Sequence, residues 1–181
     1  MIKHIFLDMV GVLAEERTEN LTQEELIVLN AKDKYKFDDD FYDYLKYVFD
    51  DKTEEEIENI VMSETNKSLM PINLDIIAKI YDYDPEIKVY IITNHVSVAE
   101  KWFEEHFPYG ISNVFTSGSV GIAKPSEYFI EYCLKQVGAE KEETLYIDDD
   151  LKNVESAMEV GIKADVYNVT MDLMEVIERY L

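Results

Sequence analysis

Carboxylates follow two short apolar runs of the sequence. Asp8 comes directly after the run 5–7, and Asp148 and Asp149 come after a second run, 144–147. Short runs of this kind are typical of buried β-strands, and ligands bind at the carboxyl ends of strands in open α/β sheets. Carboxylates at neighbouring strand ends repel one another unless a cation lies between them, and oxygen ligands select a hard ion. The sequence therefore predicts a Mg²⁺ site at these carboxylates.

Two other positions offer groups that bind an anion. Thr93 and Asn94 end another strand-like run, 88–93, and Lys124 stands in a glycine-containing loop before Pro125. The Thr93 hydroxyl and the amides after it can donate hydrogen bonds to a phosphate, and Lys124 adds a positive charge. Taken singly, each of these residues also has an ordinary structural explanation. Together with the acidic positions above, they make four strand ends or loops with polar groups: Asp8, Thr93-Asn94, Lys124 and Asp148-Asp149. Stability alone hardly explains all four in this order, and they predict a phosphate site beside the metal.

Hydrophobic patterning predicts the elements that must position these residues. Short apolar runs alternate with amphipathic segments along most of the chain. The runs predict strands at 5–7, 88–93, 113–116, 144–147 and 163–167, and the amphipathic segments predict helices at 74–83, 97–107, 126–138, 153–160 and 172–180. This alternation predicts an α/β fold, a doubly wound, Rossmann-like parallel sheet with helices on both faces and right-handed crossovers.

Residues 14–70 differ in character from the rest of the chain. They hold 17 acidic residues against 7 basic ones, contain neither glycine nor proline, and show helical patterning. Because they interrupt the first βα unit, we predict a small all-helical cap domain at 14–70 and a core domain formed by 1–13 and 71–181. The aromatic residues between Tyr35 and Phe49 could line a substrate pocket, although packing is the commoner role of such stripes.

Three sequence signatures predict where helices begin. Each pairs a hydroxyl residue with a glutamate three positions later, which is the pattern of a capping box. The pairs are Thr22 with Glu25, Thr53 with Glu56, and Ser97 with Glu100.

The overall charge restricts the partners of the protein. Its formal net charge is −22 and its pI is near 4.3, whereas nucleic acids and anionic membranes bind cationic surfaces. We expect neither as a partner, and an anionic substrate would require local positive charge, most simply a bound metal. Cys133 is the single cysteine, which excludes an intramolecular disulfide and indicates a reducing compartment. Without a signal-peptide pattern or a membrane-length apolar run, we expect a cytoplasmic protein.

The motifs around these residues resemble those of the haloacid dehalogenase-like hydrolase superfamily, over nearly the whole chain outside 14–70. The first motif of that superfamily is a strand followed by Asp-x-Asp-Gly-Val, and residues 8–12 match it except at Val10. The other motifs are a Thr or Ser after a strand, a lysine before proline, and a paired acid with a downstream Asn. They are matched by Thr93, Lys124-Pro125, and Asp148-Asp149 with Asn153.

The resemblance implies a phosphatase that uses Mg²⁺ and acts on a small phosphorylated metabolite such as a sugar phosphate. In such enzymes the first aspartate, here Asp8, attacks phosphorus, and water then hydrolyses the aspartyl phosphate. The metal ligands implied are Asp8, Asp148 and the main-chain carbonyl of Val10, with Asp149 acting through water. The phosphoryl group would be held by Thr93 and Asn94, with Lys124 neutralising charge on Asp8 and the phosphate. The cap would choose the substrate.

Val10 is a departure from the pattern. Most phosphatases of the superfamily carry an aspartate there, which protonates the leaving oxygen and later activates water. The carbonyl of Val10 can still bind a metal, but its side chain cannot transfer a proton, a role worth ~10² to 10⁴ in rate. His95, directly after Thr93 and Asn94, is a candidate substitute, and the alternative is a helix-start histidine with no catalytic role.

Val10 also leaves two other functions open. One is a dehalogenase or a carbon–phosphorus hydrolase, but a dehalogenase would not need the acidic pair Asp148 and Asp149. The other is a protein that binds a phosphorylated ligand or partner without turnover, but such a protein would have little reason to keep Lys124 and both acids.

Overall fold

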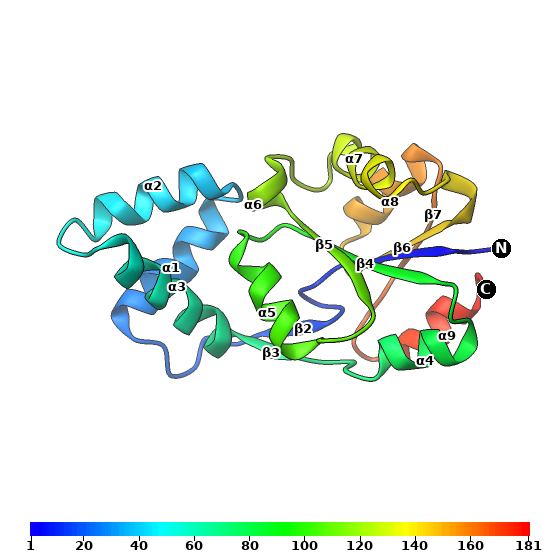
Figure 1. The fold of residues 1–181 in the computed structure, drawn as a ribbon, viewed down its shortest axis with the longest axis horizontal. Helices are drawn as coiled ribbons and strands as arrows, with labels where there is room; N and C mark the ends of the chain where they lie inside the picture. Colours follow the sequence, from blue (N-terminus) through cyan, green and yellow to red (C-terminus); the bar gives the residue numbers. More distant parts are fainter.

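The computed structural model describes residues 1–181 and has a parallel sheet at its centre (Figure 1). Its five strands are arranged in the order β5-β4-β1-β6-β7. Their bounds are β1 His4–Leu7, β4 Lys88–Thr93, β5 Ile111–Thr116, β6 Thr144–Asp148 and β7 Lys163–Val166. β1 is therefore the central strand, with β4 and β6 as its neighbours, and all four pairings are parallel. The predicted sheet is confirmed.

Helices cover both faces of this sheet. Ile5 and Leu7 pack with one set, which comprises α4 Ile76–Tyr83, α5 Val98–His106 and α9 Leu173–Glu178. Phe6 and Tyr146 face the other way and pack with α7 Glu127–Val137 and α8 Leu151–Val160. Successive strand residues point to opposite faces, so a run that is apolar throughout requires helices on both sides. The predicted doubly wound fold is confirmed.

Three further helices lie together at one end of the molecule, beyond the carboxyl ends of the strands (Figure 1). They are α1 Gln23–Lys34, α2 Asp38–Val48 and α3 Glu54–Ser68, and we call them the three-helix unit. Phe41 and Phe49 are buried in their apolar cluster, which supports the packing interpretation of the aromatic stripe. Val96 and Val98, from the other part of the chain, belong to the same cluster.

The segment 14–70 is not helical at its ends. β2 Ala14–Glu16 pairs antiparallel with β3 Leu69–Pro71, so a two-stranded ribbon joins the three-helix unit to the sheet. Strands this short carry no period that could be recognised in the sequence. The short helix α6 Ser117–Val120 was also not predicted, and it lies within a segment that the sequence indicated to be a loop.

Two of the three predicted capping boxes are present. The hydroxyls of Thr22 and Thr53 accept hydrogen bonds from the amides three residues later, and the paired glutamates bond back. The prediction at Ser97 was wrong, because Ser97 has helical backbone angles and its side chain makes no capping bond. Its amide instead donates to the Asp38 carboxylate at 2.9 Å, and Glu100 accepts from the Thr116 hydroxyl at 3.2 Å.

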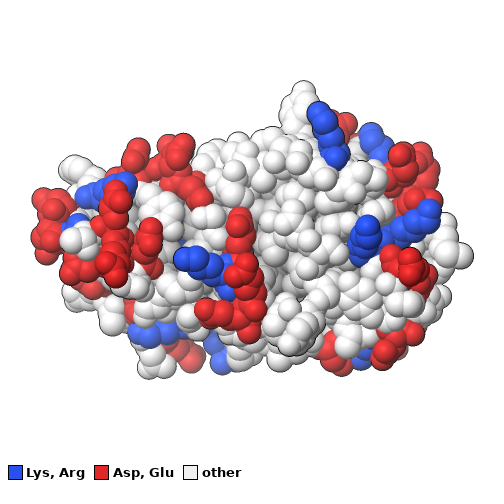
Figure 2. Space-filling model, in the orientation of Figure 1, with Lys and Arg blue, Asp and Glu red and all other residues white.

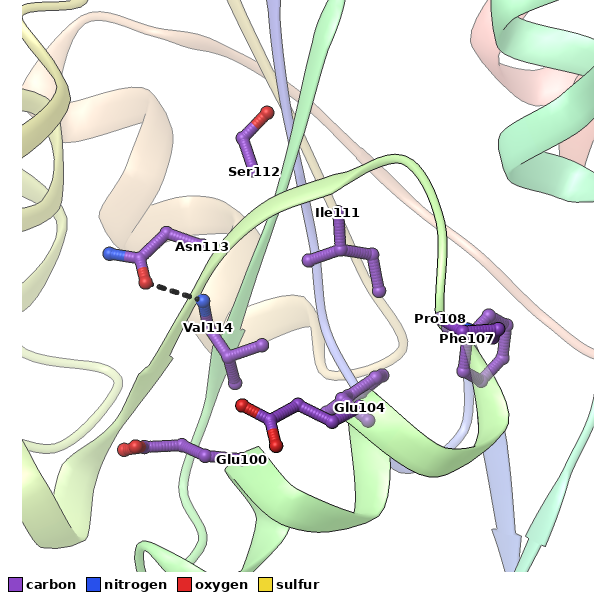
Figure 3. A pocket seen from close by; sticks show the side chains of 9 residues that line it. Glu100, Glu104, Phe107, Pro108, Ile111, Ser112, Asn113 and Val114 are labelled. Atoms are coloured by element: carbon purple, nitrogen blue, oxygen red, sulfur yellow. Dashed lines mark hydrogen bonds between the residues drawn. The ribbon is translucent and has the colours of Figure 1, made fainter.

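Strand β5 forms an open edge of the sheet beside α5. A hollow of about 320 Å³ lies between them (Figure 3), and none of the predicted site residues lines it. At this edge the Asn113 side-chain oxygen accepts a hydrogen bond from the Val114 amide at 3.0 Å. A satisfied edge amide is less available for pairing with another strand.

Acidic side chains gather over the three-helix unit, form a second group near the middle of this face beside basic ones, and recur among basic side chains at the opposite end (Figure 2). A largely uncharged area separates the middle group from that end. An anionic ligand therefore depends on positive charge within its own site. None of the helices combines enough length and apolar character to cross a bilayer.

Candidate active site

The sheet order brings the predicted site residues to one edge. Asp8 follows the central strand, Thr93 ends β4 on one side of it, and Asp148 ends β6 on the other. The pairing of Leu7 with Ile91 and with Ile147 sets this alignment. Parallel strands end together, which is why residues distant in the sequence meet here.

Lys124 reaches into the site from the loop after α6. Its Nζ lies 2.6 Å from Oδ1 of Asp8 and 2.7 Å from Oδ2 of Asp148, and all three side chains are buried. A buried ammonium between two carboxylates balances charge that neither acid could carry alone at this depth. Lys124 therefore joins the two acids into one electrostatic unit.

Burial and the neighbouring charges shift the pKa values of these three groups in opposite directions. Burial raises the pKa of Asp8 to about 7, and the Asp148 charge adds to this, although Lys124 opposes it. Burial acts in the same direction on Asp148, but Lys124 and further hydrogen bonds outweigh it and lower the pKa of that carboxyl. The pKa of Lys124 is raised by its two carboxylate partners, although burial alone would lower it. A cation at Asp8 would favour its ionised form.

Asp148 is held by more donors than Lys124 alone. The Asn153 amide donates to both of its oxygens, at 3.0 and 3.1 Å, and the Asp150 amide donates to Oδ1 at 2.8 Å. The Tyr146 hydroxyl donates to Oδ2. This network fixes the orientation of the Asp148 carboxylate.

The Asp149 carboxylate lies near those of Asp8 and Asp148, and Asp149 is exposed whereas the other two are buried. Its carboxylate lies against Gly11, where a Cβ atom would overlap it. One carboxylate oxygen from each of Asp8, Asp148 and Asp149 can be chosen so that all lie within 4.8 Å of one another. Oxygen donors at this spacing fit a hard divalent cation such as Mg²⁺. These three acids are three of the four predicted metal ligands, and their role in binding a metal stays a prediction.

Asn94 contacts Lys124 rather than standing free beside Thr93. Its Oδ1 accepts from the Lys124 amide at 2.7 Å, and its Nδ2 donates to the Lys124 carbonyl at 2.9 Å. Thr93 is buried at the end of β4. The predicted phosphate role of Asn94 remains a prediction, and the contact that the structure displays is with the lysine main chain.

The two residues considered for proton transfer are poorly suited to donate a proton. Val10 has an aliphatic, partly buried side chain. Burial, with the nearby charges of Lys32 and Lys36, lowers the pKa of His95 to about 3, so its imidazole is neutral at pH 7. Its Nδ1 lies 3.0 Å from the Val96 carbonyl. A neutral imidazole of this low basicity holds no proton suited to a leaving alkoxide.

Tyr146 and a buried ion pair were missed in the sequence. Tyr146 lies two residues before Asp148 on one strand, so the two side chains share a face, and that spacing could have revealed the contact. Lys32 of α1 and Glu64 of α3 form the ion pair, and Lys32 also donates to Thr65 at 2.6 Å. Lys32 follows Val28 and Ala31 on a buried helix face, which was the available signal.

A family model described as "Haloacid dehalogenase-like hydrolase" matches residues 5–166. Among curated proteins, a sesquiterpene phosphatase of Aspergillus oryzae is 33% identical over 78 residues, which are 42% of this chain and 40% of that protein. A drimenol cyclase of Aspergillus calidoustus is 36% identical over 55 residues, which are 30% of this chain and 10% of that protein. The chain therefore matches less than half the length of either relative.

Solved structures extend the similarity to the whole fold. A HAD family enzyme of Bacteroides thetaiotaomicron, in complex with magnesium and inorganic phosphate, superposes with a TM-score of 0.73 at 20% identity, covering 97% of this chain and 99% of that one. A HAD-like family hydrolase of Porphyromonas gingivalis gives 0.74 at 20% identity, covering 99% and 97%. The L-2-haloacid dehalogenase of Xanthobacter autotrophicus gives 0.65 at 13% identity, covering 98% and 82%. With the family model spanning most of the sequence, the chain belongs to the haloacid dehalogenase-like hydrolase family.

Proposed function

We propose that this protein is a Mg²⁺-dependent phosphatase that acts on a small phosphorylated metabolite, such as a sugar phosphate. The observation that carries the proposal is the buried Lys124 ammonium between Asp8 and Asp148, beside a third carboxylate. The magnesium and phosphate in the B. thetaiotaomicron structure support it, as does the name of the A. oryzae relative.

Asp8 is the proposed nucleophile. Its Oδ1 is already paired with Lys124, so its other oxygen is the one proposed to attack phosphorus, forming an aspartyl phosphate as the bond to the leaving oxygen breaks. Water then hydrolyses this intermediate and releases inorganic phosphate. Lys124 offsets the negative charge of Asp8 and of the phosphoryl oxygens, and Thr93 and the amides after it donate to those oxygens.

The proposed metal ligands are Asp8, Asp148, Asp149 and the main-chain carbonyl of Val10. The first three are the carboxylates that the structure brings together. When bound, Mg²⁺ would neutralise charge on the phosphoryl oxygens and favour the ionised form of Asp8. The hydrogen bonds from Asn153 and Tyr146 would hold Asp148 in place for this task.

The leaving group is proposed to depart without a proton from this chain. Val10 has none to give, and His95 is neutral at pH 7. The rate of the first step should then depend steeply on the acidity of the leaving group. Among phosphorylated metabolites, this favours those whose leaving oxygen is the better anion, so a sugar phosphate esterified at its anomeric oxygen is favoured over one esterified at a primary alcohol.

The three-helix unit is proposed to act as the cap, within residues 14–70, and to select a hydrophilic substrate. Its buried polar pair of Lys32 and Glu64 lies close enough to His95 for the Lys32 charge to lower the pKa of the imidazole. One oxygen of Glu64 is buried without a hydrogen-bond partner. Buried polar groups of this kind favour a ligand that can hydrogen-bond.

Phosphate release from a panel of sugar phosphates, nucleotides, prenyl phosphates and p-nitrophenyl phosphate tests the proposal. With Mg²⁺ present, the native chain should hydrolyse members of the panel, and Asp8→Asn should lose about 10³-fold or more. Binding of inorganic phosphate without turnover of any member would instead favour the binding protein. Halide release from a 2-haloacid without Mg²⁺ would favour the dehalogenase.

A further inference from the structure

The segment that follows Thr93 is held at every residue by a different neighbour. Asn94 bonds to the Lys124 main chain, as described above. The His95 carbonyl accepts a hydrogen bond from the Gly118 amide at 3.0 Å. The next residue along, at position 96, is buried in the apolar cluster of the three-helix unit. The conformation of this segment therefore depends on elements that are distant in the sequence.

A fourth contact of this segment, at Ser97, is made by the three-helix unit. Oδ1 of Asp38, in the first turn of α2, accepts a hydrogen bond from the Ser97 amide at 2.9 Å. Ser97 is the N-cap of α5, and its own side chain makes no capping bond. The first amides of a helix lack partners within the helix, and a carboxylate there is favoured by the helix dipole. Asp38 therefore accepts the amide of the N-cap residue itself, whereas the amides of Ala99 and Glu100 in α5 bond to the carbonyls of Val96 and Ser97.

The fold leaves room for this contact. A Cβ atom on Gly118 would overlap the Asp38 carboxylate and would lie 2.7 Å from the Cα atom of Val96. Beside it, the Ser117 hydroxyl donates to the Lys36 carbonyl at 2.7 Å. The stretch Lys36–Asp38 thus contacts both the segment after Thr93 and the start of α6, the helix that precedes the loop of Lys124.

We propose that Asp38 is a positioning residue for the reaction. By anchoring the Ser97 amide, it holds the segment after Thr93 in the conformation that binds the phosphoryl group while the three-helix unit is docked. The kinetic part of this inference rests on the proposed phosphatase function. The anchoring itself is a property of the fold.

Amide hydrogen exchange of the full-length protein tests the anchoring. In Asp38→Ala, the Ser97 amide should exchange about tenfold faster or more than in the native chain, because it loses a charge-assisted acceptor. Asp39→Ala is the matched control, since Asp39 stands in the same first turn of α2 but is exposed. Both variants lose a favourable charge at the N-terminus of α2, and only Asp38→Ala loses the bond to Ser97. Equal Ser97 exchange in the two variants would overturn the proposal.

The affinity for inorganic phosphate in the presence of Mg²⁺, measured by calorimetry, tests the positioning. Asp38→Ala should bind phosphate about tenfold more weakly and should lower kcat on p-nitrophenyl phosphate by a similar factor. Asp38→Asn keeps the Oδ1 acceptor and should stay within about threefold of the native values. Asp39→Ala should match the native chain in both measurements.

These outcomes separate the two claims. A native chain that binds phosphate but releases none from p-nitrophenyl phosphate or the metabolite panel contradicts the phosphatase, and the phosphate affinities still decide the role of Asp38. Faster Ser97 exchange in Asp38→Ala with unchanged phosphate affinity would overturn the positioning role and leave Asp38 as a structural anchor of the Ser97 amide.

Discussion

Asn94 holds the main chain of Lys124 from both sides, with its Oδ1 2.7 Å from the lysine amide and its Nδ2 2.9 Å from the lysine carbonyl. Asn94 follows β4, whereas Lys124 lies in the loop after α6. This pair of bonds joins the end of β4, where Thr93 lies, to the loop that carries the buried ammonium. The two bonds fix the main chain from which the Lys124 side chain extends to Asp8 and Asp148.

Replacing Asn94 should therefore impair the reaction through Lys124. We expect Asn94→Ala to lower kcat/KM on p-nitrophenyl phosphate by about 10- to 100-fold, the effect of losing two hydrogen bonds in a site that requires accurate geometry. Asn94→Asp keeps one acceptor for the Lys124 amide and should retain more activity than Asn94→Ala. Asn113→Ala, at the exposed edge of the sheet, is the control. Activity of Asn94→Ala equal to that control would show that the lysine does not depend on Asn94.

Removing the charge of Lys124 should destabilise the metal-free protein. Lys124→Met leaves the buried carboxylates of Asp8 and Asp148 facing each other without a cation, and breaking a buried pair in this way costs about 3–5 kcal/mol. Because Mg²⁺ can replace the missing charge, the variant should gain more stability from added Mg²⁺ than the native chain does. Urea denaturation with EDTA and with Mg²⁺ measures both effects. Equal Mg²⁺ stabilisation of the two proteins would contradict this account of the charge balance.

The raised pKa of Asp8 predicts how the stability of the metal-free protein changes with pH. In the folded chain this pKa is about 7, above its ordinary value of 3.8. Between these values the folded state holds a proton that the unfolded state has lost, so the contribution of Asp8 to the free energy of unfolding falls as the pH rises. From pH 5 to pH 7.5 the native chain in EDTA should lose at least about 1 kcal/mol more than Asp8→Asn. Parallel pH profiles for the two proteins would show that Asp8 is ionised throughout.

Gly11 is predicted to keep the space that Asp149 occupies. It has a φ of +89°, and a Cβ atom there would overlap the Asp149 carboxylate. Gly11→Ala should weaken Mg²⁺ binding by about tenfold or more, because it displaces a carboxylate of the proposed donor set. Gly138→Ala is the control, since its φ of +65° imposes a similar backbone strain in open space. If calorimetry shows the same Mg²⁺ affinity for both variants, Asp149 does not take part in metal binding.

Much of the fold could be predicted from the sequence because its signals are local. The strand β4 was predicted with the observed bounds, and Thr22 and Thr53 begin helices as their capping boxes indicate. The meeting of Asp8 with Asp148 followed from a general rule, that parallel strands end at one edge of a sheet. These features follow from the periodicity of apolar residues and from the order of strands and helices, and both can be read from the sequence.

The contacts that organise the site depend on three-dimensional packing and were not predictable in the same way. The bond from Ser97 to Asp38 spans elements that are distant in the sequence, and it replaces a capping box that the local pattern indicated. The hydrogen bonds between the Asn94 side chain and the Lys124 main chain also depend on how the segment after β4 packs against the loop after α6. The ribbon of β2 and β3 consists of strands too short to show a period. In each case, the contact is made with a residue that is distant in the sequence.

The leaving-group dependence of the first chemical step distinguishes native Val10 from a restored acid. Across a series of aryl phosphates of different leaving-group pKa, the native chain should show a steep fall in kcat/KM as that pKa rises. Val10→Asp should flatten the slope, because a positioned acid is worth ~10² to 10⁴ for poor leaving groups. The ratio kcat/KM is the quantity to compare, since it reports the step in which Asp8 is phosphorylated. A shallow slope for the native chain would show that another group supplies the proton.

The central claim is that Asp8 becomes phosphorylated during turnover. Acid quenching of the native chain during hydrolysis of p-nitrophenyl phosphate with Mg²⁺, followed by peptide mass spectrometry, tests this most directly. We expect a phosphoryl group on Asp8 of the native chain, and neither this adduct nor phosphate release in Asp8→Asn. Sustained phosphate release by Asp8→Asn, with no phosphoryl group on residue 8, would contradict it.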